Sequence, residues 1–181
     1  MDDGKVGIYR YFKRVIGFVI SLIALIVLSP VILIVGILVY IKLGTPIIFK
    51  QERIGLNRKP FIMYKFRSMR QQDPEEEKKD WTVKNDPRKT KIGAFIRKTS
   101  IDELPQLINV IKGDMSLVGP RPSLPKEVDK FEDWMYERLS VKPGLTCYWQ
   151  VSGRNNIDFY EWMKLDIKYV RERNLLIDIK L

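Results

Sequence analysis

Two adjacent carboxylates, Asp102 and Glu103, stand at the head of a short apolar segment, and Arg121 follows a Gly-Pro pair further along the chain. A carboxylate can act as a nucleophile or bind a divalent cation. An arginine presents a planar fork of N–H donors that suits phosphate. The stretch from Ser100 to Pro122 is therefore the first place to look for chemistry.

The residue types that are absent narrow the possible reactions. The chain has 181 residues, with no histidine and a single cysteine, Cys147. Histidine-dependent catalysis is excluded, and so are an intramolecular disulfide and a zinc knuckle. Neither a Gly-x-Gly-x-x-Gly run nor a P-loop sequence occurs. Carboxylates, lysines, hydroxyls and one thiol remain for covalent or acid–base work.

The acidic pair is expected at the start of a helix that runs to Lys112. Pro105 lacks an N–H and is tolerated only in the first turn, so this helix should begin at or just before residues 102–104. Gly113 should end it. Its buried face is expected to consist of Leu104, Leu107, Ile108 and Ile111.

Two interpretations of Asp102 follow from this position. In the first, Asp102 is an ordinary N-cap that stabilises the helix by about 1 kcal/mol. In the second, Asp102 and Glu103 bind a hard cation such as Mg²⁺ together with phosphate oxygens, which the N–H groups of a helix start also favour. The stiff Gly119-Pro120 turn would then aim Arg121 at a phosphate.

A segment near the N-terminus is long and apolar enough to enter a membrane. No charged residue occurs from Val15 to Ile41, a run of 27 residues. As a helix, this run would reach about 40 Å, compared with about 30 Å of bilayer hydrocarbon. We expect a membrane-embedded part over residues 1–44 and a catalytic domain over residues 45–181.

Two membrane topologies are compatible with this segment. Ser29-Pro30 lies near the middle of the run, where proline removes a backbone hydrogen bond and bends a helix. Basic residues flank both ends equally, which favours both ends on the cytoplasmic side. A re-entrant hairpin that turns at Ser29-Pro30 satisfies both observations. The alternative is a spanning helix with a tolerated proline kink.

The remaining pattern predicts an α+β fold that is mostly helical. Residues 45–69 alternate apolar and polar around a polar turn at 55–58, which indicates a β-hairpin. Residues 92–96 form an apolar patch between basic residues, typical of an amphipathic helix at a membrane surface or against a core. Residues 71–80 are expected to form an acidic loop or short helix. An extended segment and a turn over 142–154 should precede a helix over 158–172.

Several short motifs, in a fixed order, link the chain to a known family. The motifs are Lys13-Arg14, Ser29-Pro30, Gln51-x-Arg53-x-Gly55, Tyr64-Lys65-Phe66-Arg67-Ser68-Met69, Ile96 to Gln106, Gly113-Asp114-Met115-Ser116, Val118-Gly119-Pro120-Arg121-Pro122, Lys142-Pro143-Gly144-Leu145-Thr146 and Gln150-Val151-x-Gly153-Arg154. From about Tyr9 to the C-terminus, the chain resembles the bacterial sugar transferase family, the monotopic phosphoglycosyl transferases.

The resemblance implies a polyprenyl-phosphate sugar-1-phosphate transferase. Asp102 would attack the β-phosphate of a UDP-sugar, releasing UMP and leaving a phosphosugar on the aspartate. A polyprenyl (undecaprenyl) phosphate would then take the phosphosugar and become a polyprenyl diphosphate sugar. In bacteria this is the first membrane step in the assembly of an exopolysaccharide, O-antigen or glycoprotein glycan. Displacement at phosphorus needs charge neutralisation more than a strong base, which suits a chain without histidine.

The same resemblance implies the site and its partners. Mg²⁺ is the expected cofactor, bound by Asp102 and Glu103, with Glu103 as a metal or orientation partner. The expected partners are a UDP-sugar, polyprenyl phosphate and membrane lipids, with no nucleic acid. The residues expected to bind phosphate or nucleotide are Lys65, Arg67, Arg97, Pro120, Arg121, Arg154 and Asp166.

The resemblance also favours the re-entrant hairpin and a location. A lipid phosphate lies at the headgroup plane and a nucleotide sugar arrives from the cytosol, so the site should lie where these two meet. We expect the bacterial inner (cytoplasmic) membrane, with the catalytic domain and its interfacial amphipathic helices on the cytoplasmic face. Lys13 and Arg14 should mark the headgroup plane beside the hairpin that turns at Ser29 and Pro30.

A function of another class stays open on charge alone. A net charge of +10 also suits a non-catalytic, membrane-anchored basic module that binds anionic lipid or nucleic acid. The order and spacing of Asp102, Glu103 and Arg121 favour the enzyme. The sugar that is transferred and the oligomeric state are not encoded in any motif of this chain.

Overall fold

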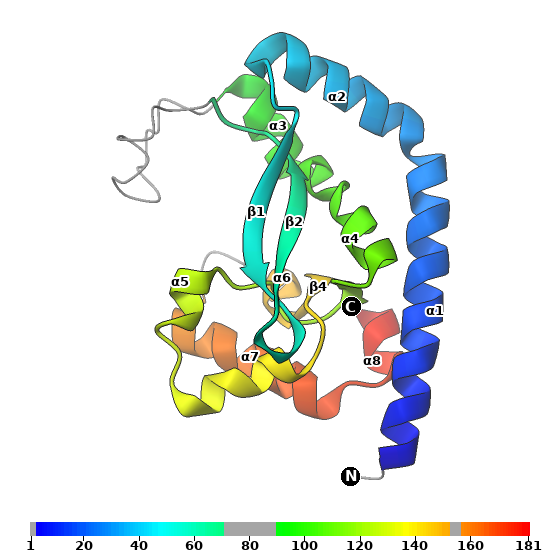
Figure 1. The fold of residues 1–181 in the computed structure, drawn as a ribbon, viewed down its shortest axis with the longest axis vertical. Helices are drawn as coiled ribbons and strands as arrows, with labels where there is room; N and C mark the ends of the chain where they lie inside the picture. The colour runs from blue at the N-terminus through cyan, green and yellow to red at the C-terminus, as the bar shows by residue number, and fades with distance from the viewer. Residues whose placement is uncertain (1–2, 71–89, 153–156) are drawn as a thin grey trace.

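The computed structural model describes residues 3–70, 90–152 and 157–181. Within these ranges the fold is mostly helical with a small β-hairpin, as predicted (Figure 1). The predicted acidic segment at residues 71–80, and Arg154 with its neighbours, lie outside the described residues.

A bent pair of helices forms one side and the top of the molecule (Figure 1). The helices are α1 (Asp3–Val27) and α2 (Ser29–Leu43), and they meet at an angle of 63°. The bend has a local cause, because Pro30 has no N–H to donate to the carbonyl of Ile26. The Ser29 hydroxyl donates to that same carbonyl at 2.7 Å. The predicted break at Ser29-Pro30 is therefore confirmed.

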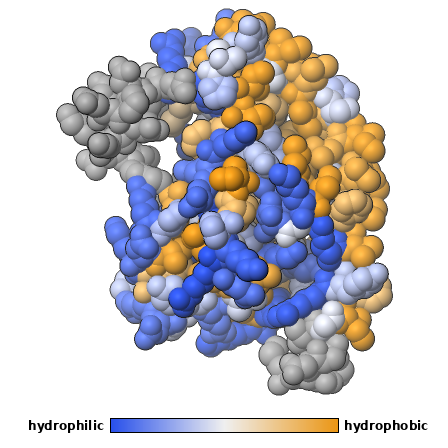
Figure 2. All heavy atoms as spheres, in the orientation of Figure 1, coloured by the Kyte–Doolittle hydropathy of each residue, from blue (hydrophilic) through white to orange (hydrophobic). Residues whose placement is uncertain are grey.

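The outer surface of this bent pair is apolar. Among the described helices, none is long and apolar enough by itself to cross a membrane, although α1 and α2 together meet that criterion as a broken span or a re-entrant loop. Figure 2 shows hydrophobic residues gathered along the side and top formed by α1 and α2, with hydrophilic residues over the face of the domain. Side chains more than half exposed include Ile8, Phe12, Ile26, Leu33 and Ile41.

The predicted β-hairpin is present and runs through the centre of the molecule (Figure 1). Strands β1 (Ile48–Ile54) and β2 (Pro60–Phe66) pair antiparallel, with Phe49 opposite Lys65. The short turn η1 (Leu56–Arg58) joins them and turns tightly because Asn57 has φ 54°. The hairpin extends from the α2 end of the molecule to the C-terminal helices.

The amphipathic helix predicted around residues 92–96 is α3 (Lys91–Lys98). Thr90 caps it by accepting a hydrogen bond from the N–H of Gly93 at 3.1 Å. Its apolar face packs into a core shared with α2 and β2. The members of this core are Val35, Val39, Phe66 and Ile96.

Asp102 and Glu103 lie in the 3₁₀ turn η2 (Ile101–Glu103), which leads into α4 (Gln106–Lys112). The predicted end at Gly113 is confirmed, with φ 93°. The N-cap interpretation of Asp102 is wrong. The left-handed Ser100 precedes η2, and Pro105 precedes α4, so Asp102 caps neither element.

The predicted buried face of α4 is partly wrong. Leu107 is buried, whereas Ile108 is 41% exposed and Asn109 is fully buried beside Val110. Asn109 faces inward because it links α4 to β2. Its side-chain amide donates to the Ile62 carbonyl at 2.7 Å, and its side-chain oxygen accepts from the N–H of Tyr64 at 3.1 Å.

A second, parallel pair of short strands holds the Gly-Pro-Arg turn. These strands are β3 (Ser116–Val118) and β4 (Gly144–Thr146). The backbones approach so closely just after β3 that a Cβ on Gly119 would lie 2.5 Å from the carbonyl oxygen of Lys142. This close approach requires glycine. The N–H of Gly144 in turn donates to the carbonyl of Pro120 at 2.9 Å.

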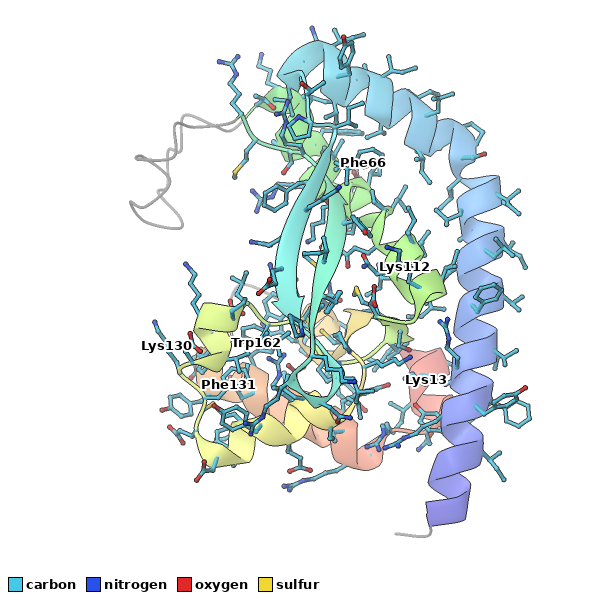
Figure 3. All side chains as sticks on the ribbon, in the orientation of Figure 1. Lys13, Phe66, Lys112, Lys130, Phe131 and Trp162 are labelled. Carbon is cyan, nitrogen blue, oxygen red and sulfur yellow. The ribbon has the colours of Figure 1, made fainter. Side chains whose placement is uncertain are left out.

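The C-terminal part is helical. The elements are α5 (Pro125–Val128), η3 (Asp133–Ser140), α6 (Tyr148–Val151), α7 (Phe159–Glu172) and α8 (Leu175–Lys180). The predicted helix over 158–172 is confirmed as α7, and Asp158 caps it by accepting from the N–H of Glu161 at 2.7 Å. The segment after 142 is only partly extended, because β4 leads into α6. Figure 3 shows Phe131 and Trp162 lying together near α5 and α7.

Candidate active site

Three predicted residues meet where β2 faces η2. The Nζ atom of Lys65, on β2, lies 2.8 Å from Oε1 of Glu103, and about a fifth of each side chain is exposed. Asp102 is buried on the same turn, and its charge interacts with those of Lys65, Glu103 and Arg97. Two carboxylates and two cations, all predicted for the site, therefore share one location.

The environment of Asp102 has opposing effects on its ionisation. Burial raises the pKa of the Asp102 carboxyl, and the charge of Glu103 raises it further. Lys65 and Arg97 act in the opposite direction, because a nearby cation favours the carboxylate. The pKa of Asp102 is raised overall. A perturbed carboxyl beside cations is typical of a reactive site, although structural ion pairs have similar effects.

A narrow cleft runs from Lys65 and Glu103 to the Gly-Pro-Arg turn, and Asp102 lies on the same turn as Glu103 without lining the cleft. The residues that line it include Arg53, Lys65, Glu103, Gln106, Arg121 and Gln150. Burial lowers the pKa of Lys65, and the positive charge of Arg121 contributes to that shift. Burial also lowers the pKa of Arg53 to about 10, again with a contribution from Arg121. Several cations that repel one another converge here, which suits an anionic ligand.

The hairpin and the parallel strand pair fix the turn that carries Arg121. The N–H of Ile54 donates to the carbonyl of Ser123, and Arg53 donates to the carbonyl of Pro122, both at 2.9 Å. Pro120 is buried and accepts the hydrogen bond from Gly144 described above. The guanidinium of Arg121 lies 5.2 Å from the ring centre of Trp149, within cation–π range.

A buried arginine that the sequence analysis missed supports the same turn. Arg138, in η3, is 1% exposed. Its guanidinium donates to the carbonyl of Arg121 at 2.7 Å and to the hydroxyl of Ser123. The sequence signal was the helical spacing that places Arg138 on one face with Met135 and Leu139. The structure buries all three side chains.

Asp166 is the counter-ion of Arg138, and the two groups form a fully buried ion pair. Burial raises the pKa of the Asp166 carboxyl, and the adjacent Arg138 opposes that shift. One carboxylate oxygen, Oδ1, makes no hydrogen bond with the described residues. The structure therefore places Asp166 beneath the Arg121 turn and not in the open cleft.

Other predicted site residues lie away from the cleft. The guanidinium of Arg67 is buried and donates to the carbonyls of Leu43, Gly44 and Thr45, at the end of α2. Those three bonds engage both terminal nitrogens of the guanidinium, and the remaining donor, Nε, is buried. The structure thus does not bring Arg67 to the acidic pair, although Arg67 lies only two residues after Lys65, just past the end of β2.

Lys13 and Arg14 attach α1 to the domain. Lys13 forms an ion pair of 2.8 Å with Asp178 and also donates to the hydroxyl of Tyr169. Figure 3 shows Lys13 pointing from α1 toward the C-terminal helices. Arg14 donates to the carbonyl of Ile111 at 2.6 Å, near the end of α4.

The carboxylates fit a metal ion only if the substrate completes its coordination. Within residues 3–70, 90–152 and 157–181, no group of three or more acidic, cysteine or histidine side chains is placed to hold a cation. Mg²⁺ commonly binds one or two carboxylates together with substrate phosphates and water. Asp102 and Glu103 match that requirement, with Lys65 as a competing partner of Glu103.

Comparison with known proteins places this arrangement in a family. The family model described as bacterial sugar transferase matches residues 8–181. The chain belongs to the bacterial sugar transferase family. The match begins within α1 and includes the hairpin, the acidic pair and the Arg121 turn, so every residue of the site described above lies within it.

Individual members of the bacterial sugar transferase family are also similar. The galactosyl transferase CpsE of Streptococcus agalactiae is 55% identical over 77% of this chain. The undecaprenyl-phosphate galactose phosphotransferase of Salmonella typhimurium is 44% identical over 94%. The UDP-glucose:undecaprenyl-phosphate glucose-1-phosphate transferase of Escherichia coli is 39% identical over 99%. These matches cover only 34%, 38% and 40% of the respective relatives.

Proposed function

We propose that this protein transfers a sugar-1-phosphate from a UDP-sugar to polyprenyl phosphate, releasing UMP and forming a polyprenyl diphosphate sugar. The observation that carries the proposal is the Lys65–Glu103 ion pair beside the buried Asp102, at one end of a cleft that also contains Arg121. Relatives whose names specify undecaprenyl-phosphate sugar transfer support the choice of substrates.

In the proposed first step, a carboxylate oxygen of Asp102 attacks the β-phosphorus of the UDP-sugar. The bond from that phosphorus to the bridging oxygen breaks, and the electron pair leaves with UMP. Lys65 and Arg121 would neutralise the charge on the phosphate oxygens, which is the main requirement of phosphoryl transfer. The product of this step is a phosphosugar bound to Asp102.

In the second step, an oxygen of the polyprenyl phosphate attacks the same phosphorus and releases Asp102. Glu103 would orient the acid pair and, with Asp102, hold Mg²⁺. When bound, Mg²⁺ would neutralise charge on the diphosphate and on the departing UMP. The hydrogen bonds around Arg121, from Arg53, Gly144 and Arg138, keep the turn in place through both steps.

The membrane arrangement belongs to the same proposal. We propose that α1 and α2 enter one leaflet of the cytoplasmic membrane as a re-entrant hairpin, with the Ser29-Pro30 bend deepest in the lipid. The 63° bend and the exposed apolar surface of α1 and α2 support this placement. The catalytic domain would then lie at the cytoplasmic face, where a lipid phosphate and a soluble nucleotide sugar can both reach the cleft.

A UMP-release assay tests this function. The purified chain in detergent is incubated with Mg²⁺, undecaprenyl phosphate and each of a panel of UDP-sugars. We expect UMP release and a polyprenyl diphosphate sugar from at least one sugar, with both absent for Asp102→Asn. Failure to release UMP from every sugar would instead favour the non-catalytic basic module.

A further inference from the structure

A larger cavity, of about 470 Å³, lies between α1 and the domain, away from the acidic pair. Five cationic side chains line it, and among the described lining residues there is no carboxylate. The cations are Arg10, Lys13, Arg14, Lys142 and Arg173. Since Lys13 is paired with Asp178 at the margin, four cations remain around this space without an acidic lining partner.

Two of these cations converge on one point, the end of α4. A Cβ on Gly113 would lie 3.3 Å from an Arg14 guanidinium nitrogen and 3.5 Å from Nζ of Lys142. Arg14 has a structural role there, because it donates to the carbonyls of Val110 and Ile111. Lys142 makes no hydrogen bond or ion pair with the described part of the chain. Burial and the charge of Arg14 lower the pKa of Lys142, and the negative charge of Asp114 opposes that shift only in part.

Asp114 offsets the repulsion around Lys142 only in part, so the arrangement is unfavourable without a further anion. Like charges held close together in a partly buried place repel, and removal from water increases the cost. A phosphate group would relieve both effects by accepting charge-assisted hydrogen bonds from ammonium and guanidinium groups. The volume also falls within the range of ordinary ligand sites.

The cavity is separate from the cleft that Lys65, Glu103 and Arg121 line. No residue lines both spaces. Met63, which lines the cleft, packs in one buried cluster with Val110 and Met115, which line the cavity. This cluster is the wall between them, so an anion in the cavity is not at the reacting carboxylate.

The position of the cavity indicates the chemical nature of its ligand. The turns of α1 that direct Arg10 and Arg14 into the cavity expose Ile8, Tyr11 and Phe12 on their outer surface, at 63%, 70% and 55%. Apolar side chains, including Leu56 and Val141, also line the cavity. We propose that this cavity binds a phosphate-bearing anion, supplied either by the headgroup of an anionic lipid or as a free phosphate.

A binding titration on the purified full chain in non-ionic detergent tests the proposal. Three probes are compared: dihexanoyl phosphatidylglycerol, dihexanoyl phosphatidylcholine and inorganic phosphate. We expect Lys142→Gln to weaken binding of an anionic probe about tenfold, as expected for loss of one charge-assisted hydrogen bond. Lys142→Arg should retain the affinity for the anionic probe. Arg10→Gln, which removes another cation from the cavity lining, should also weaken binding of that probe.

The matched control is Lys164→Gln, which removes one exposed cation from α7 outside the cavity. Its affinities should equal those of the unaltered chain. Any anion binding at the cleft lined by Lys65 and Arg121 is the same in all variants, so it does not affect the comparison. Sensitivity confined to phosphatidylglycerol would identify a lipid headgroup, and equal sensitivity for inorganic phosphate would identify a free anion. Equal binding of phosphatidylcholine, or equal affinities of Lys142→Gln and Lys164→Gln, would overturn the proposal. No UDP-sugar is present, so this result is independent of the transferase activity.

Discussion

Lys65 on β2 and Glu103 on η2 form an ion pair of 2.8 Å that joins the central hairpin to the acidic turn. The pair places an ammonium group beside Asp102, whose carboxylate it stabilises. The same ammonium group lies in the cleft that contains Arg121. Lys65 is therefore positioned to serve both Asp102, the proposed nucleophile, and an anionic ligand in the cleft.

Replacing Lys65 should slow the proposed transfer reaction. In Lys65→Met, the stem is retained but no cation faces the phosphate, and kcat/KM for UMP release should fall by about 10²–10³-fold. Lys59→Met, at an exposed position next to β2, is the matched control and should leave kcat/KM unchanged. Equal rates for the two variants would remove Lys65 from the proposed mechanism.

The raised pKa of Asp102 has an effect on activity and an effect on stability. Because attack requires the carboxylate, UMP release should decline as the pH falls through a pKa that lies above the ordinary 3.8. An acid whose pKa is raised by folding binds protons more tightly in the folded state, so its ionisation reduces stability as the pH rises through that pKa. Asp102→Asn should therefore be at least as stable as the unaltered chain at pH 7.

Urea unfolding of the two proteins at pH 7, together with a pH profile of UMP release, checks both effects. A lower urea midpoint for Asp102→Asn would show that the ionised carboxylate stabilises the fold, contrary to the direction of the pKa shift.

Elements with strong local signals could be predicted from the sequence. Pro30 fixed the break between α1 and α2, the polar turn at 55–58 fixed the hairpin, and Gly113 fixed the end of α4. Each of these depends on the backbone chemistry of one or two residues. Of the residues expected at the site, Lys65, Glu103 and Arg121 line the cleft. Arg53, Gln106 and Gln150 also line it and were not among the expected site residues.

Contacts between distant segments could not be predicted in the same way. Periodicity identifies a face of a helix but not the surface that it meets, so Ile108 was expected inside and Asn109 was overlooked. The alternating pattern placed Arg67 on the same face as Lys65, yet the hydrogen-bond partners of Arg67 are carbonyls at the end of α2. The partners of the buried Arg138 come from two segments far apart in the sequence.

The Arg138–Asp166 pair should be critical to stability. Arg138→Met leaves Asp166 buried without a counter-ion, which should cost about 3–5 kcal/mol. Removing both charges in Arg138→Met with Asp166→Leu should recover a large part of that loss. Urea unfolding measures both changes. If the double variant is no more stable than Arg138→Met, the uncompensated charge is not the cause.

The re-entrant arrangement predicts that both ends of the α1–α2 pair lie on one side of the membrane. In a Cys147→Ser background, single cysteines at Asp3 and Lys59 should resist an impermeant thiol reagent applied to intact cells. Both should react once the cells are opened. Labelling of Asp3→Cys from outside, with Lys59→Cys protected, would instead establish a spanning helix.

Mass spectrometry of a trapped intermediate can determine whether Asp102 carries the phosphosugar. The purified chain is incubated with Mg²⁺ and a reactive UDP-sugar in the absence of polyprenyl phosphate, and is then quenched and digested. We expect a phosphosugar adduct on the peptide that contains Asp102, formed with one equivalent of UMP and absent from Asp102→Asn. An adduct on another residue, or turnover by Asp102→Asn, would contradict this expectation.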